Sequence, residues 1–198
     1  MTDPERKAEG RPPPHAGAAL AWWVRLTDEK TGDRGVMARL RRANGFAEAW
    51  SEAETMSLYR TLGLDARHRS RWVEAVGLLA IVLAHVRENG GGSLGGALGG
   101  DPPVLNPLRL RRLTAARDGA ELLRGFREVV ALLGGRAPVV DLARCVLFWL
   151  DEDARDATRT RFLFDYHGAG FAAPQADPTN PDDQTGADDA AEPAEPTR

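Results

Sequence analysis

The segment from Trp72 to Val86 limits the possible folds more than any other part of this chain. Glu74 is its only formally charged residue, and apolar residues occupy nearly every other position. A helix that is apolar on all sides has to be covered by other helices, because none of its faces suits water. The longest apolar run, residues 75–84, is too short to span a bilayer. We therefore expect this segment to be the buried central helix of a helical bundle.

Amphipathic segments precede and follow this central helix. Helical spacing of apolar residues predicts helices over residues 18–30 and 36–43, and a third from about Ser51 or Glu54 to a C-cap at Gly63. Four more are predicted over residues 108–117, 120–133, 138–150 and 153–166. No stretch alternates convincingly with a period of two, so the fold class is predicted to be all-α.

Glycine and proline separate the predicted helices into two groups. Residues 89–107 are rich in both, which predicts either a linker between two domains or a long functional loop. The glycine run that starts at Gly90 lacks the Gly-Lys-Ser/Thr ending of a P-loop and follows a helix, so nucleotide hydrolysis is not expected. We predict two small helical bundles joined by a Gly/Pro-rich linker, at residues 17–88 and 108–168, the second a four-helix bundle.

Both ends of the chain are predicted to be disordered, over residues 1–16 and 169–198. The C-terminal tail carries seven acidic residues against Arg198 alone. Since the whole chain has a formal charge of −3, the remainder carries about +3, almost entirely from arginine, because only Lys7 and Lys30 are lysines. The first residues include no apolar signal region, so we expect a cytoplasmic protein that does not enter a membrane.

Arginines are concentrated between residues 109 and 127, where leucines and Phe126 recur at helical spacing. Packing of the apolar residues is expected to leave four arginines outside: Arg109, Arg112, Arg124 and Arg127. This pattern predicts a cationic surface carried on helices. The alternative is an ordinary solvated helix face, in which Glu121, Arg124 and Glu128 form ion pairs. Arginine suits the first interpretation because its planar group binds phosphate oxygens in pairs.

The sequence predicts no catalytic residue, metal site or cofactor. Cys145 is the only cysteine, which excludes an internal disulfide and a thiolate-rich zinc site, and its apolar surroundings predict a buried structural thiol. The four histidines lie far apart along the chain, without a Ser-His-Asp or paired-carboxylate arrangement. We therefore expect a binding protein rather than an enzyme.

Several short motifs, taken in order, resemble the CasB family, the small subunit of type I-E CRISPR surveillance complexes (Cascade). The resemblance covers residues 18–170. Its landmarks are Trp22-Trp23, Leu40-Arg41-Arg42, Ala66-Arg67-His68, the loop from Ser93 to Leu98, Arg109-Leu-Arg-Arg-Leu-Thr-Ala, Leu-Leu-Arg-Gly-Phe-Arg127, Phe148-Trp149 and Phe164-Asp165-Tyr166. One departure is the acidic run after Trp149, where family members often carry basic residues.

Membership of this family implies a two-part helical fold without catalysis. It also implies partners: crRNA and target DNA bound through their backbones, the backbone and large subunits of Cascade, and a second copy of the chain. The residues that the resemblance places at nucleic acid are Arg42, Arg67, Arg109 and Arg127, with Arg41 and Arg112 as neighbours of the same sign. Together with Arg124, they are the predicted nucleic-acid-binding residues.

The predicted function is that of a non-catalytic subunit in RNA-guided antiviral defence, whose basic surface stabilises the guide–target duplex and the displaced DNA strand. Specificity would then come from the guide. The alternative is a helical adapter whose arginines dock acidic protein partners. The acidic tail, in either case, is a candidate intramolecular competitor for the basic face.

Overall fold

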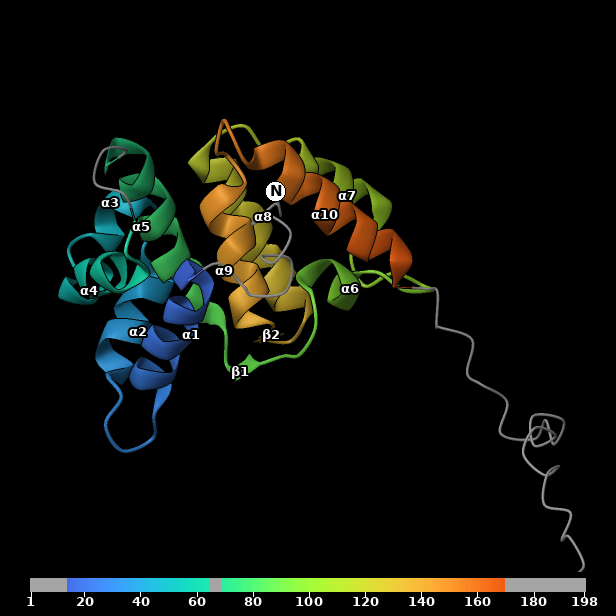
Figure 1. The fold of residues 1–198 in the computed structure, drawn as a ribbon. Coiled ribbons are helices and arrows are strands. Elements are labelled where there is room, and N and C mark those ends of the chain that lie inside the picture. Colours follow the sequence, from blue (N-terminus) through green and yellow to red (C-terminus); the bar gives the residue numbers. More distant parts are fainter. Residues whose placement is uncertain (1–13, 65–68, 170–198) are drawn as a thin grey trace, which may run out of the picture.

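A computed structural model of the chain describes residues 14–64 and 69–169, and Figure 1 shows its arrangement of helices. The elements in chain order are α1 (Pro14–Thr27), α2 (Arg34–Arg42), α3 (Phe46–Ala49), α4 (Ala53–Leu62), α5 (Arg69–His85), β1 (Glu88–Asn89), α6 (Leu94–Leu98), α7 (Pro107–Thr114), α8 (Gly119–Leu132), β2 (Arg136–Ala137), α9 (Val139–Phe148) and α10 (Arg155–Gly168). The prediction of a helical fold is confirmed. The predictions for residues 1–13, residues 170–198 and Arg67 lie outside the described residues.

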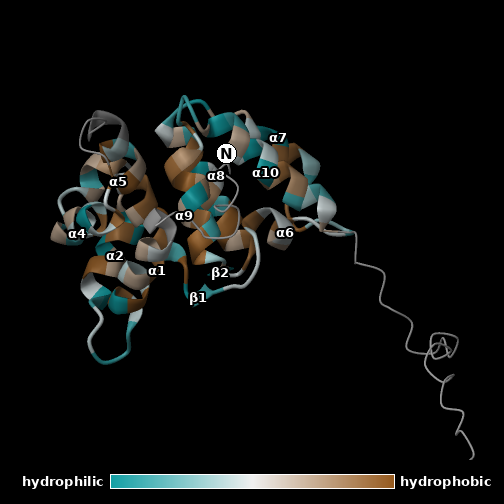
Figure 2. Ribbon diagram, in the orientation of Figure 1, coloured by the Kyte–Doolittle hydropathy of each residue, from teal (hydrophilic) through white to brown (hydrophobic). Residues whose placement is uncertain are grey.

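Helix α5 lies at the centre of the molecule, as its composition predicts. Every residue from Leu78 to Ala84 is at most 2% exposed. Helices α2, α3 and α4 pack against α5 on one side, and α8 and α9 pack against it on the other (Figure 1). Apolar residues line α5, α8 and α9 where these helices meet (Figure 2). Burial on all sides therefore explains why this helix needs no polar face.

An aromatic stack joins the helices of the C-terminal half. Trp149, at the end of α9, lies between Phe126 of α8 and Phe162 of α10, with ring centroids 5.4 and 5.3 Å away and near-perpendicular planes. Edge-to-face contacts of this kind add about 0.5–1.5 kcal/mol each beyond the burial of their area. The three side chains are at most 2% exposed, so they fix the relative positions of these helices.

Residues 89–107 contain a short helix, α6, that packs tightly on α10. Leu94, Leu98 and Leu105 are at most 1% exposed, so this segment contributes to the core. Gly95 and Gly99 lie so close to α10 that a Cβ atom on them would come within 2.3 Å of the Phe162 carbonyl oxygen and 2.0 Å of the Tyr166 carbonyl oxygen. The glycines of this loop are therefore needed where two backbones meet.

A buried carboxylate fixes the start of α6. Asp141 of α9 is 8% exposed, and its Oδ2 accepts the backbone N–H of Leu94 at 2.8 Å. Its Oδ1 lies 3.0 Å from the guanidinium of Arg161 on α10. One side chain thus connects α6, α9 and α10.

Two short strands, which the sequence patterns did not predict, connect the end of α5 to the start of α9. They pair in parallel, Glu88 with Arg136 and Asn89 with Ala137. Two residues are too few to show an alternating pattern. The hydrophobic core includes residues from both predicted bundles, and α5 contacts α8 and α9. The division into bundles at residues 17–88 and 108–168 stays a prediction.

Candidate nucleic-acid interface

Helices α7 and α8 form a helical hairpin whose ends are set by local sequence signals. The side chain of Asn106 accepts the N–H of Arg109, and Pro107 occupies the first turn of α7. The side chain of Asp118 accepts the N–H of Glu121 in the same way at the start of α8. Such N-caps each contribute about 0.5–2 kcal/mol to helix stability. The two helices therefore begin at defined residues, which fixes which side chains face one another.

The hairpin is held closely together and fastened to the aromatic stack. A Cβ atom on Gly125 would lie 2.7 Å from Leu113 Cδ1, so the glycine allows α7 to approach α8. Trp149 Nε1 donates to the Leu113 carbonyl at 3.2 Å, and Arg159 of α10 donates to the Ala116 carbonyl at 3.0 Å. The end of α7 is thus held by two side chains from other helices.

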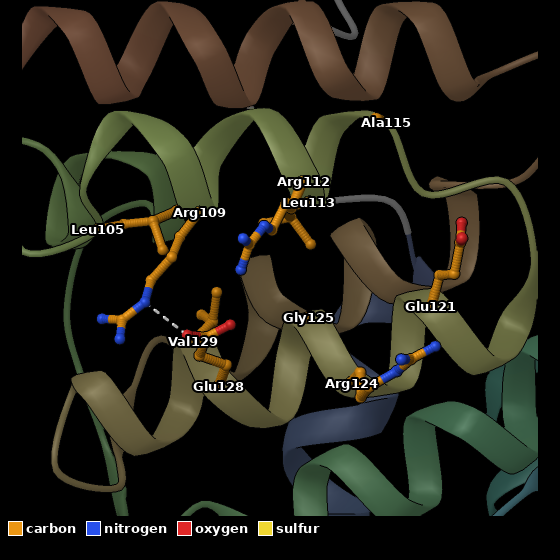
Figure 3. Close-up of a pocket in the computed structure, with 10 residues that line it drawn as sticks. All are labelled: Leu105, Arg109, Arg112, Leu113, Ala115, Glu121, Arg124, Gly125, Glu128 and Val129. Carbon is orange, nitrogen blue, oxygen red and sulfur yellow. Dashed lines mark ion pairs between the residues drawn. The ribbon is translucent and has the colours of Figure 1, made fainter.

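A groove of about 550 Å³ runs between α7 and α8, and three of the predicted arginines line it. Arg109 and Arg112 extend from α7 toward α8, and Arg124 projects from α8 (Figure 3). Leu105, Leu113 and Val129 form an apolar part of its wall, and Glu121 and Glu128 are also at its edge. The structure therefore brings Arg109, Arg112 and Arg124 together in one groove, which the sequence analysis expected only as a cationic surface.

The three groove arginines differ in the partners that they have within the protein. Arg109 forms an ion pair with Glu128, its Nε lying 2.6 Å from the carboxylate. Arg112 and Arg124 are exposed, and their guanidinium groups make no hydrogen bond or ion pair within residues 14–64 and 69–169. The predicted pairing of Arg124 with Glu121 and Glu128 is not found among these residues. Two cations of the groove thus remain available to an anion.

Arg127 lies on α8 but outside this groove, and it serves the fold. Its Nη2 donates to the backbone carbonyls of Arg41 and Ala43, at the C-terminal end of α2. Burial lowers the pKa of Arg127 from its usual value. The sequence prediction that packing leaves Arg127 outside is therefore wrong: its side chain is partly buried because the end of α2 covers it. A cation at the C-terminus of a helix also stabilises the helix dipole.

Arg41 and Arg42 at the end of α2 likewise bond to helix carbonyls. Arg41 Nε donates to the Ala84 carbonyl in the last turn of α5 at 2.5 Å, and Arg42 Nε donates to the Ala38 carbonyl of its own helix at 3.1 Å. Both side chains are nevertheless exposed. Neither lines the groove between α7 and α8. The predicted arginines that the structure describes therefore form two groups, one in this groove and one at the C-terminal end of α2.

His85 and Arg87 share a second, smaller pocket with Arg127. Burial lowers the pKa of His85, and the positive charges of Arg127 and Arg41 lower it further, against a hydrogen bond to the Arg41 backbone that raises it. Arg87 follows the end of α5 with no neighbouring basic motif, so the sequence analysis did not single it out. Its aliphatic stem packs against Gly135, which has a positive φ of 86°.

Neither a metal centre nor a membrane span is found in the described part of the chain. No group of three or more His, Cys, Asp or Glu side chains is arranged to hold a metal ion among those residues. Nor does any helix among them have the length and apolar character needed to cross a membrane.

Comparison with known protein families places most of the described chain in a family. The family model described as CRISPR-associated protein Cse2 matches residues 36–167, which is two thirds of the chain and includes the entire α7–α8 groove. No curated protein matches the chain, and no solved structure matches it.

Proposed function

This chain belongs to the CRISPR-associated Cse2 family, the small subunits of type I-E Cascade complexes, and we propose that its α7–α8 groove binds the phosphate backbone of nucleic acid in such a complex. The family resemblance drawn from the sequence is confirmed. The groove then helps to hold the guide–target duplex and the displaced DNA strand, and the subunit acts without catalysing a reaction.

The observation that carries this proposal is the state of Arg112 and Arg124. Both are exposed in one groove, and neither has a partner within the described part of the chain. An arginine that supports the fold has its guanidinium engaged, as Arg127 does at the end of α2. An unengaged arginine instead presents its planar set of donors to a phosphate.

Arg109 can also bind a phosphate together with Arg112 and Arg124, but it must first break its ion pair with Glu128. Its ion pair with Glu128 is half-exposed, with side-chain exposures of 40% and 45%, so the pair contributes roughly 0–1 kcal/mol. A phosphate oxygen can therefore replace the Glu128 carboxylate. If each of the three arginines contacts one phosphate, a plot of the logarithm of the binding constant against the logarithm of the salt concentration should have a slope of about −2 to −3.

A weak isolated affinity fits a subunit that works within an assembly. Contacts with the other Cascade subunits and with a second copy of the chain would place the groove against the nucleic acid, so that binding becomes intramolecular. The groove then needs no sequence preference, because base pairing with the guide supplies specificity.

The test is binding of fluorescent single-stranded DNA, double-stranded DNA and RNA to the full chain, measured by anisotropy at several salt concentrations. The variant Arg112→Glu/Arg124→Glu should lose binding at low salt. The matched control is Arg60→Glu/Arg111→Glu, because it changes the net charge equally. Arg111 is exposed on the same helix, yet it lies outside the groove, and Arg60 is exposed on α4.

Circular dichroism should show that all three proteins have the same helix content. Equal loss of binding in both double variants would mean that net charge, rather than the groove, attracts nucleic acid. If no nucleic acid binds at low salt, either to the unaltered protein or to one whose seven acidic residues after Ala169 are replaced by Asn and Gln, the groove is a protein-docking face, as the adapter interpretation requires.

A further inference from the structure

Residues 170–198 combine a strong negative charge with attachment close to the groove. They carry seven acidic residues and one arginine, a net charge of −6 in a chain whose total is −3. The described residues end at Ala169, immediately after α10. The chain therefore has a polyanion of its own, and the position of α10 decides where that polyanion starts.

The C-terminal end of α10 contacts the segment between α6 and α7, and that segment includes a residue of the groove wall. The Tyr166 hydroxyl donates to the Leu105 carbonyl at 2.6 Å, and Leu105 lines the groove beside Arg109. Ala169 packs against Gly99, since a Cβ atom on that glycine would lie 2.8 Å from the Ala169 Cβ. The C-terminal segment thus leaves the described structure near the Arg109 end of the groove.

Chain length allows the acidic residues to reach every arginine of the groove. Asp177 is the first acidic residue after Ala169, eight residues further on, and eight residues span at most about 26–29 Å. Helix α7 has eight residues and is about 12 Å long. Asp182 and Asp183 follow within reach of Arg124. No contact requires a second molecule.

We propose that the acidic segment from Asp177 to Glu195 docks in the α7–α8 groove of its own chain and occupies Arg112 and Arg124 until nucleic acid displaces it. Within residues 14–64 and 69–169 neither arginine is paired with a carboxylate, so this segment offers them the opposite charge that the fold does not. The docking proposal depends only on the negative charge of this segment and on its attachment to the end of α10. Its consequence, that the segment competes with nucleic acid, rests on the function proposed above.

Competition of this kind makes binding selective. A short or isolated nucleic acid has to displace carboxylates held at a high effective concentration by the chain itself. A duplex presented by the whole complex contacts many sites at once and displaces them readily. The segment thereby suppresses binding to unrelated nucleic acid without affecting the assembled state.

Docking can be tested directly by zero-length carbodiimide coupling, which joins a carboxylate to an amine in contact with it. Two full-length variants, Arg112→Lys and Arg124→Lys, each place one amine in the groove. Arg60→Lys on α4 is the control, and the exposed Lys30 provides an internal reference. Coupled peptides are identified by mass spectrometry after proteolysis.

The groove variants should couple to peptides from residues 177–195 at least about fivefold more than Arg60→Lys does, at low salt and at the mass of a monomer. High salt should remove this difference because the contact is ionic. Coupling no greater than that of Arg60→Lys overturns the proposal, and so does a product found only at the mass of a dimer.

A second measurement connects docking with function. Replacing the seven acidic residues of the segment by Asn and Gln in the full chain should lower the Kd for single-stranded DNA about tenfold at low salt. The gain should vanish when Arg112→Glu/Arg124→Glu is added, and a gain that persists overturns competition at the groove. Groove-dependent DNA binding without coupling would reject the docking proposal alone. Coupling in the unaltered segment, together with no DNA binding even by the Asn/Gln-substituted protein, would reject the proposed function alone.

Discussion

Replacing Gly95 or Gly99 by alanine should destabilise the protein, because these two glycines set the distance between α6 and α10. The added methyl of Gly99→Ala would lie 2.0 Å from the Tyr166 carbonyl oxygen, and that of Gly95→Ala 2.3 Å from the Phe162 carbonyl oxygen. An ordinary contact of this type needs about 3.4 Å, so α10 would have to move by roughly 1 Å or more. The Tyr166–Leu105 hydrogen bond and the Arg161–Asp141 ion pair lie on the moving helix.

The size of the effect follows from two opposing contributions. Overpacking of a dense interior costs about 1–3 kcal/mol. Alanine recovers up to about 1 kcal/mol within helix α6 at residue 95, because glycine is a poor helix former. We therefore expect a net loss of about 0–2 kcal/mol for Gly95→Ala and a larger one of about 1–3 kcal/mol for Gly99→Ala. The double variant should lose less than the sum, since one movement of α10 relieves both contacts.

Urea unfolding followed by circular dichroism measures these losses, and Gly91→Ala is the matched control. Gly91 lies two residues before the N-cap of α6, its φ is not positive, and a methyl group on its Cα would meet no heavy atom within 4 Å. Its replacement should be neutral or stabilising by up to about 1 kcal/mol. If all three variants unfold at the same urea concentration, close packing is not the reason for these glycines. If stability is unchanged but nucleic-acid affinity falls, the loop contacts a ligand instead.

Three further predictions concern side chains whose roles the structure defines. Arg127→Leu should cost about 1–3 kcal/mol in urea unfolding, because two carbonyls at the end of α2 lose their donor, and a change below about 0.5 kcal/mol would refute that role. Asp141→Asn should cost a similar amount by weakening its contact with Arg161, and an unchanged urea midpoint would show that α6 and α10 do not depend on this charge. When the pH is lowered from about 7 to 5.5, the free energy of unfolding should fall less in His85→Gln than in the unaltered protein. Burial holds the folded pKa of His85 below its usual value, so the unfolded chain binds more protons as the pH falls, and identical pH profiles would contradict this.

Helices could be predicted from the sequence wherever their apolar spacing was long enough to repeat. Helix α8 was expected over residues 120–133 and is found at Gly119–Leu132, and the αL C-cap at Gly63 lies where the sequence places it. The five-residue α6 is too short for its spacing to be recognised, and its glycines indicated a loop. Gly95 and Gly99 are explained only by the close approach of α6 to the backbone of α10.

Burial of the arginines was harder to predict because it depends on contacts between distant segments. Helical spacing predicted that Arg112 and Arg124 stay outside the packed apolar residues, and both are exposed. That they share one groove with Arg109 depends on α7 and α8 being neighbours, which spacing within each helix does not show. Arg127 follows the same local pattern as Arg124, yet it meets the end of α2, 86 residues away in the chain. No local periodicity contains that information.

The division of the arginines also determines which variants can report on nucleic-acid binding. Charge reversal at Arg127 would place a carboxylate against the carbonyl oxygens at the end of α2, so lost binding could follow from a disturbed fold. Reversal at Arg109 would face Glu128 and repel it. Arg112 and Arg124 make no contact that the described fold needs, so a change there alters the groove's charge with the least effect on the protein. A loss of binding confined to these two would therefore be evidence for direct contact with phosphate.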